Sequence, residues 1–150
     1  MVNYDFFIKK TIAYAENCPI QPYRFGAIIT FKDRILCYGS NSYVKTHPDM
    51  IFHSNYHNDI HNHNKNFIHA EIQVCNTFEN ILFGLRNNQK NKIIRKTLLY
   101  IANIRKDEKI SIAKPCNVCI SKIKSIGIKK IIYTILNKDE NKINYIVEEI

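Results

Sequence analysis

Residues 113–134, AKPCNVCISKIKSIGIKKIIYT, decide the fold of this chain. Pro115 is suited to the first turn of a helix, and apolar residues then recur at the spacing of one buried helix face. These apolar residues are Ile120, Ile123 and Ile126. Gly127 supplies a helix stop, and the β-branched run after it predicts a strand over residues 129–136. A helix followed directly by a buried strand is typical of an α/β protein.

The rest of the chain alternates between helix and strand signals in the same way. Further helices are expected at residues 3–16 and 72–84, and further strands at 25–31, 34–38, 97–104 and 143–149. Residues 85–96 are basic and rich in Asn, and we expect a connector there. Only residues 137–142 separate the last two strands, which is too short for a parallel crossover and predicts an antiparallel hairpin. We therefore expect a three-layer α-β-α sandwich around one mixed sheet of four to five strands.

Length and composition bound the class of protein. The 150 residues predict a single domain over residues 1–150, with a core large enough to need no disulfide. The net charge of +9 favours a polyanionic partner, although the abundance of Ile, Asn and Lys also fits an A/T-rich coding sequence.

Three of the five cysteines, Cys18, Cys37 and Cys75, lie in apolar segments, where buried free thiols are expected. Free thiols and the lack of an export signal favour an intracellular, cytoplasmic protein.

Two short motifs carry the chemistry, His69-Ala70-Glu71 and Pro115-Cys116-Asn117-Val118-Cys119. Imidazole and thiolate ligands suit Zn²⁺, and three protein ligands leave the fourth tetrahedral position open, as in catalytic sites. The two cysteines are spaced to lie on one side of the first turn of a helix. His69 and Glu71 would point apart in a regular helix, so His69 is expected at the irregular start of its helix. The predicted zinc ligands are His69, Cys116 and Cys119.

Glu71 is predicted to be the catalytic residue, because it is a carboxylate that the metal does not need as a ligand. Zinc lowers the pKa of coordinated water toward about 7, and a nearby carboxylate can then carry protons. Attack on an electron-poor carbon of an aromatic amidine, such as C4 of cytosine, would release ammonia. Backbone N–H groups at Ala70 and Cys116 are candidates for orienting the substrate.

Other interpretations stay open at this point. A Cys-x-x-Cys pair is also found in structural zinc sites, so a non-catalytic, zinc-stabilised binding module is one alternative. Residues 47–66 form a polar, His- and Asn-rich insertion that is expected to be a loop, with a short helix near residues 50–52. Within it, His53, His57 and His61 are spaced so that a helix would align them for a second metal ion, although polar filler is the alternative.

With these motifs in place, the chain resembles the cytidine/deoxycytidylate deaminase superfamily, and most closely the deoxycytidylate-type enzymes and the small deaminases of viruses and phages. The resemblance covers about residues 23–134. Three blocks carry it. The first is Phe25-Gly26-Ala27-Ile28-Ile29, followed by Arg34-Ile35-Leu36 and Gly39-Ser40-Asn41. The second is His69-Ala70-Glu71, and the third is residues 113–134. Lys-Thr-His-Pro at residues 45–48 also resembles the viral and phage enzymes.

The resemblance implies the fold and several roles. It implies zinc held by His69, Cys116 and Cys119, proton transfer by Glu71, and contact of Asn41 with the sugar. A turn-capping Asn41 is the alternative. Homo-oligomers are common in this superfamily, so a homo-oligomer is expected.

The resemblance also bears on the substrate. We expect zinc-dependent hydrolytic deamination of cytosine in a free nucleotide or nucleoside, with dCMP converted to dUMP. Lys45, Arg105 and Lys114 are candidates for holding a phosphate, and Phe25 and Tyr133 for stacking on the base. The alternative is a deaminase acting on a base in single-stranded DNA or RNA, including tRNA, in keeping with the basic stretches at 86–96 and 122–130.

Overall fold

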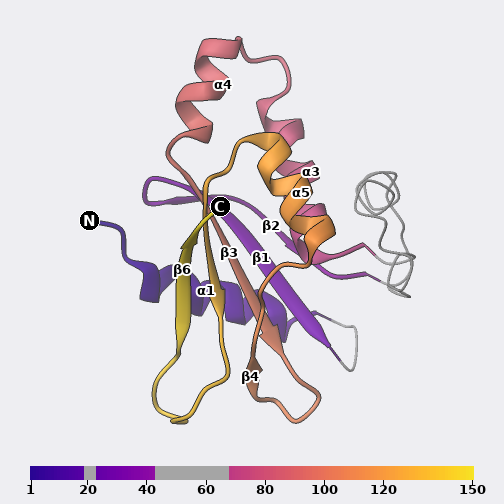
Figure 1. Cartoon of the computed structure of the whole chain (residues 1–150), viewed down its shortest axis with the longest axis vertical. Coiled ribbons are helices and arrows are strands. Elements are labelled where there is room, and N and C mark those ends of the chain that lie inside the picture. The colour runs from indigo at the N-terminus through magenta and orange to yellow at the C-terminus, as the bar shows by residue number, and fades with distance from the viewer. Residues whose placement is uncertain (19–22, 43–67) are drawn as a thin grey trace.

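The computed structural model describes residues 1–18, 23–42 and 68–150 (Figure 1). Four helices lie in these ranges, α1 (Tyr4–Glu16), α3 (Ala70–Leu82), α4 (Asn87–Ile94) and α5 (Asn117–Ile126). The strands there are β1 (Arg24–Phe31), β2 (Arg34–Ser40), β3 (Thr97–Ile104), β4 (Ile110–Ser111), β5 (Lys130–Thr134) and β6 (Tyr145–Glu149). None of these helices combines the length and the hydropathy that a membrane-spanning segment requires.

One mixed sheet of six strands runs through the molecule in the order β2-β1-β3-β5-β6, and β4 pairs with the end of β3. The β3–β5 pair is parallel, and α5 forms the crossover between its strands. The remaining pairs, β1–β2, β1–β3, β3–β4 and β5–β6, are antiparallel. The antiparallel β5–β6 hairpin confirms the prediction, because the segment between these strands is too short for a crossover helix.

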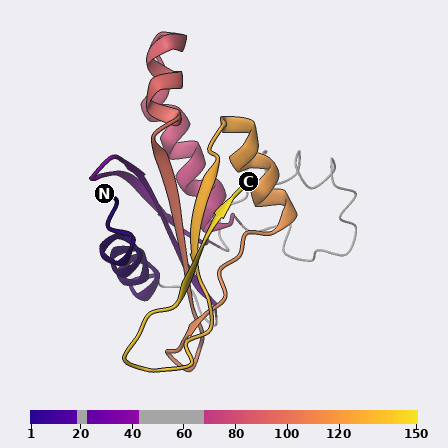
Figure 2. The same ribbon diagram turned by 60° about the vertical axis from the view of Figure 1, so that its left-hand side comes forward.

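Helices cover both faces of the sheet and make the predicted three-layer sandwich (Figure 2). Helix α1 lies on one face, and α3 and α5 lie side by side on the other. Strand β3 is buried on both faces, so its successive side chains enter different clusters. Leu99 and Ile101 pack with α3 and α5, whereas Tyr100 packs with Phe7 and Ile8 of α1. The continuous apolar run of β3 reflects this double burial.

The predicted face of α1 is the buried one. Its buried residues are Phe7, Ile8, Thr11, Ile12 and Ala15. The helix begins after Asn3, whose side chain accepts a hydrogen bond of 3.0 Å from the N–H of Phe6, as N-cap residues do. A Cβ on Gly26 of β1 would lie 2.6 Å from the backbone nitrogen of Ala15. Only glycine therefore allows α1 to pack this closely on the sheet.

Two elements correct the sequence-based expectation. Residues 85–96 are not a plain connector, since α4 occupies Asn87–Ile94. The segment lacks an apolar helical period and α4 contains no buried residue, so the usual helix signal is missing. The sheet also has six strands where four to five were expected, because the two-residue β4 is too short to leave a pattern.

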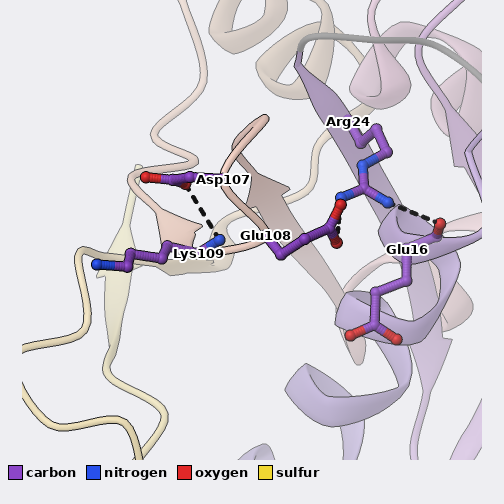
Figure 3. A network of polar contacts seen from close by, with 5 residues as sticks. All are labelled: Glu16, Arg24, Asp107, Glu108 and Lys109. Atoms are coloured by element: carbon purple, nitrogen blue, oxygen red, sulfur yellow. Dashed lines mark hydrogen bonds and ion pairs between the residues drawn. The ribbon is translucent and has the colours of Figure 1, made fainter.

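A buried arginine joins three segments at the start of β1 (Figure 3). The guanidinium of Arg24 lies 2.6 Å from the carboxylate of Glu108 and donates a 3.1 Å hydrogen bond to the carbonyl of Glu16. The turn that carries Glu108 is closed by Asp107, which accepts a hydrogen bond from the N–H of Lys109. These contacts tie the end of α1 and the turn between β3 and β4 to the first residue of β1.

The cysteines are free thiols, as expected. Cys18, Cys37 and Cys75 are buried. Burial raises the pKa of Cys37 to about 12 and raises that of Cys75 still further. The thiols of Cys37 and Cys75 are therefore neutral, and all three cysteines belong to the core.

Candidate metal centre

The starts of two neighbouring helices meet at the candidate site. His69 is the N-cap of α3 and has an extended backbone, with φ −77° and ψ 153°. Cys116 is the N-cap of α5, with φ −70° and ψ 167°. His69 therefore lies at the irregular start of its helix, as predicted. Because α3 and α5 pack side by side, the two motifs converge although 47 residues separate His69 from Cys116.

Three soft ligand atoms come together there. His69 Nδ1 lies 3.3 Å from Cys119 Sγ and 3.6 Å from Cys116 Sγ. All three ligand atoms are within 4.8 Å of one another, and this is the one such group in residues 1–18, 23–42 and 68–150. One nitrogen and two sulfurs on a small triangle fit the tetrahedral preference of Zn²⁺. The chemistry of the donor set thus agrees with a zinc ion as cofactor.

Glu71 lies in the first turn of α3, next to this triangle, and is 4% exposed. Burial raises the pKa of its carboxyl, while the neighbouring His69 and a hydrogen bond from the Cys119 thiol act in the opposite direction. The positive end of the helix dipole also favours the charged, carboxylate form of an acidic side chain in the first turn. Glu71 is therefore a deeply placed carboxyl beside the ligands.

The ligands differ in their electrostatics. A hydrogen bond from the Cys119 side chain, with further help from His69 and the Cys119 N–H, lowers the pKa of Cys116 to about 4. Burial raises the pKa of Cys119 well above its usual value. Burial lowers the pKa of His69, but contacts with Cys116 and Glu71 outweigh it and the net direction is upward. The start of α5 thus stabilises a thiolate, the form in which cysteine binds metals.

The side chain of Asn41 braces the backbone at the start of β1. Its Oδ1 accepts a 2.9 Å hydrogen bond from the N–H of Phe25, and its Nδ2 donates a 2.9 Å hydrogen bond to the carbonyl of Tyr23. The thiol of Cys18 also lies 3.3 Å from Oδ1. Asn41 therefore does more than cap the turn after Gly39. Its contact with a sugar stays a prediction.

The other predicted contact residues have different surroundings. Ala70 is fully buried in the first turn of α3, and Phe25 is half-buried against the core at the start of β1. Tyr133 is 3% exposed and donates a 2.7 Å hydrogen bond to Glu148, so the suggestion that it stacks on a base is wrong. A ring packed into the core has no free face for a ligand.

The candidates for phosphate binding are exposed and paired. Lys114 lies 3.4 Å from a carboxylate oxygen of Glu148, and Arg105 lies 3.4 Å from Asp107. The described residues do not include Lys45 or the insertion at 47–66. The second metal ion and the short helix expected in that insertion therefore also fall outside them.

Sequence reasoning missed the contacts that hold the site together. The side chain of Gln73 accepts a 2.6 Å hydrogen bond from the N–H of Ser40, which joins α3 to β2. A Cβ on Gly39 would lie 2.9 Å from the carbonyl oxygen of Ala70 and from the nitrogen of Val74. Strand β2 therefore presses directly on the first turns of α3. These residues show no local pattern that would have revealed their partners.

The comparisons with known proteins agree with this geometry. Residues 1–135 match the family described as the cytidine and deoxycytidylate deaminase zinc-binding region. No curated protein matches the chain significantly. The matched range contains both motifs and every strand except β6. The chain belongs to the family of cytidine and deoxycytidylate deaminase zinc-binding proteins.

Proposed function

We propose that this protein deaminates cytosine in a free pyrimidine nucleotide or nucleoside, and that deoxycytidylate is its preferred substrate. The products would be the uracil nucleotide and ammonia. The buried carboxyl of Glu71 beside three soft ligands carries the proposal. A purely structural zinc site has no use for such a group, whereas hydrolysis needs one to move protons. This argument favours an enzyme over a zinc-stabilised binding module.

In this proposal the metal is held by His69 Nδ1, Cys116 Sγ and Cys119 Sγ. Zinc bound there would supply the chemistry that lowers the pKa of water toward about 7. With only three ligands from the chain, at the start of α3 and the start of α5, a zinc ion held there would remain accessible to water. The helix starts also direct backbone N–H groups at the ligands, which favours the thiolate form of Cys116.

Glu71 then carries the protons. Its carboxylate accepts a proton from the attacking water, whose oxygen bonds to C4 of the cytosine ring, and delivers that proton to the ring nitrogen N3. A second proton passes through Glu71 from the added hydroxyl to the amino group. The bond from C4 to the amine breaks, ammonia leaves and uracil remains. Such a positioned carboxylate typically contributes about 10²–10⁴-fold.

The proposal also assigns three contacts with the substrate. Asn41 would contact the sugar, Phe25 would lie against the base, and the backbone N–H of Ala70 would orient the reacting group. The anchoring of Asn41 on the backbone of residues 23–25 supports a fixed orientation for its remaining amide hydrogen. Lys114 and Arg105 are the phosphate candidates among the described residues, and a bound phosphate would replace Glu148 or Asp107 as their partner.

A substrate panel tests the proposal. Zinc-loaded protein is assayed for ammonia release from deoxycytidylate, deoxycytidine, cytidine and their triphosphates, with Glu71→Gln and the exposed-site control Glu140→Gln. We expect turnover by the wild type and by Glu140→Gln, and loss of turnover with zinc retained in Glu71→Gln. Zinc-loaded wild type without turnover of any cytosine compound would overturn the proposal. Full activity of Glu71→Gln would overturn the role of Glu71.

A second substrate class is a base within single-stranded DNA or RNA. The basic segment at residues 86–96 favours it, because such enzymes track the phosphate backbone with basic side chains. Oligonucleotides containing one cytosine belong in the same panel.

The domain organisation is part of the proposal. We propose one deaminase domain over residues 1–150, supported by the single sheet that includes strands from Arg24 to Glu149.

A further inference from the structure

Helix α4 and its flanks concentrate positive charge at one end of the molecule. Between Glu79 and Asp107 the chain has seven basic residues and no acidic residue. Five of the seven lie on α4 or directly beside it. We call this set the basic cap: Arg86, Lys90, Lys92, Arg95 and Lys96. All but the half-buried Lys90 are exposed. The overall charge of +9 is thus concentrated in part on one short helix.

The basic cap has no counter-charge in the described residues. The ion pairs found there join other residues, and none includes a side chain of the cap. Glu79, the nearest acidic residue before the cap, forms an ion pair of 2.6 Å with Lys122. Like charges this close on one helix repel one another, which an anionic partner would relieve.

An exposed aromatic ring adjoins the cap. Phe83, three residues before Arg86, is 85% exposed and ends α3. The turn after it is open, since nothing lies within 4 Å of a Cβ built on Gly84. A basic surface with an exposed ring is the combination by which proteins bind single-stranded nucleic acid, because bases stack on the ring while phosphates meet the cations.

The cap lies away from the metal centre. Both views show α4 beyond the far end of α3 (Figures 1 and 2). Helix α3 begins at the candidate site and its 13 residues span about 20 Å. A free nucleotide is too small to touch the site and the cap together. A polymer of several nucleotides is long enough.

The chemistry of α4 favours nucleic acid over an anionic membrane. A membrane-binding helix needs an apolar face that enters the lipid. The apolar residues of α4, Ile93 and Ile94, pack instead against the core on the side of α3 and α5. A Cβ on Gly127 would lie 3.3 Å from Ile94, so the end of α4 is held against the end of α5. The outer surface of α4 is therefore polar and basic.

We propose that the basic cap together with Phe83 is a binding surface for single-stranded nucleic acid, separate from the metal centre. The five cations contact backbone phosphates, and the ring of Phe83 stacks on an unpaired base. Binding at this surface requires no turnover at Glu71.

The test measures binding of a fluorescent single-stranded oligonucleotide of about 15 nucleotides, a length in the range of known single-strand sites. Five phosphate contacts give a slope of log K against log salt of about −3.5, or a loss of roughly 100-fold between about 50 and 200 mM salt. A variant with all five cap residues changed to Gln should lose most of this slope. Glutamine is a good helix former, so α4 should persist.

Two matched variants sharpen the test. Changing Lys9, Lys10, Arg34, Lys138 and Lys142 to Gln removes the same charge from exposed positions elsewhere and should leave binding almost unchanged. Phe83→Ala should weaken binding by about tenfold without changing the salt slope, because stacking is not ionic.

Equal losses in the cap variant and the control variant would overturn the proposal, since they would reflect net charge alone. Binding to phosphatidylserine vesicles with no binding to the oligonucleotide would also overturn it. The outcome is separable from the deamination proposal. Glu71→Gln should still bind the oligonucleotide, and the cap variant should still turn over deoxycytidylate, so each proposal can fail while the other stands.

Discussion

The ammonium of Lys122 on α5 lies 2.6 Å from a carboxylate oxygen of Glu79 on α3. The Lys122 side chain is 6% exposed, whereas that of Glu79 is 46% exposed. The pair joins the two helices whose starts carry His69 and Cys116. It therefore helps to fix the spacing of the metal ligands at the other end of the same helices.

The two halves of this ion pair should respond differently to mutation. Glu79→Ala removes a carboxylate partner from a buried ammonium, and we expect a loss of about 1–3 kcal/mol in the free energy of unfolding. Lys122→Met replaces the cation by an apolar chain of similar length and leaves a carboxylate that water can reach, so a smaller loss is expected. Urea denaturation of both variants measures this. A larger loss for Lys122→Met than for Glu79→Ala would contradict the burial argument.

Gly39 should be needed for metal binding. In Gly39→Ala the new Cβ meets backbone atoms of Ala70 and Val74 at 2.9 Å, so the start of α3 must shift and His69 with it. Overpacking of this kind costs about 1–3 kcal/mol, and we expect weaker zinc binding in competition with a chelator. Gly26→Ala is the control, because it clashes with Ala15 on the opposite face of the sheet. It should lower stability but leave zinc affinity near that of the wild type.

Loss of one thiolate should empty the metal centre. Cys116→Ser replaces a thiolate ligand by a hydroxyl, which zinc prefers much less. We expect the purified variant to contain little zinc by elemental analysis and to have a lower melting temperature, because a metal that binds the folded state stabilises it. Cys37→Ala removes a buried thiol that is not in the ligand group and should keep a full equivalent of zinc. Equal zinc content in the two variants would refute the ligand assignment.

The contact between Tyr133 and Glu148 should make stability depend on pH. The hydroxyl of Tyr133, with Lys114 nearby, lowers the pKa of Glu148 below its usual 4.5. A lowered folded-state pKa means stability that is present above the unfolded value and is lost as pH falls through the folded value. Tyr133→Phe should therefore have a lower free energy of unfolding than the wild type at neutral pH. This difference should shrink in acid. Parallel urea curves at neutral and acidic pH measure it, and a difference that grows in acid would disprove the assignment.

Much of the fold follows from local patterns. The buried face of α1, the hairpin of β1 and β2, and the helix that ends at Gly127, with φ 99°, all rest on neighbouring residues and were predicted. Helix α4 was missed because it buries no residue, and the pattern of apolar residues is the signal that sequence reasoning depends on.

The ligand set of the candidate site was predicted, whereas its supports were not. His69, Cys116 and Cys119 are recognisable because metal chemistry restricts the residue types and their spacing. The bracing role of Asn41 and the burial of Tyr133 were not foreseen, because both depend on contacts with other strands.

By itself the sequence determined most of the helices and strands and the metal-ligand set of this protein, because helix caps, apolar periods and metal-ligand types are local properties. Only the tertiary structure decided how the elements meet. The Gln73–Ser40 bond joins residues 33 apart, and the Lys122–Glu79 pair joins residues 43 apart. Such contacts form after the chain has packed, when burial makes a hydrogen bond or an ion pair costly to leave unmade. The packing of α3 against α5 is what turns two separate motifs into one metal centre.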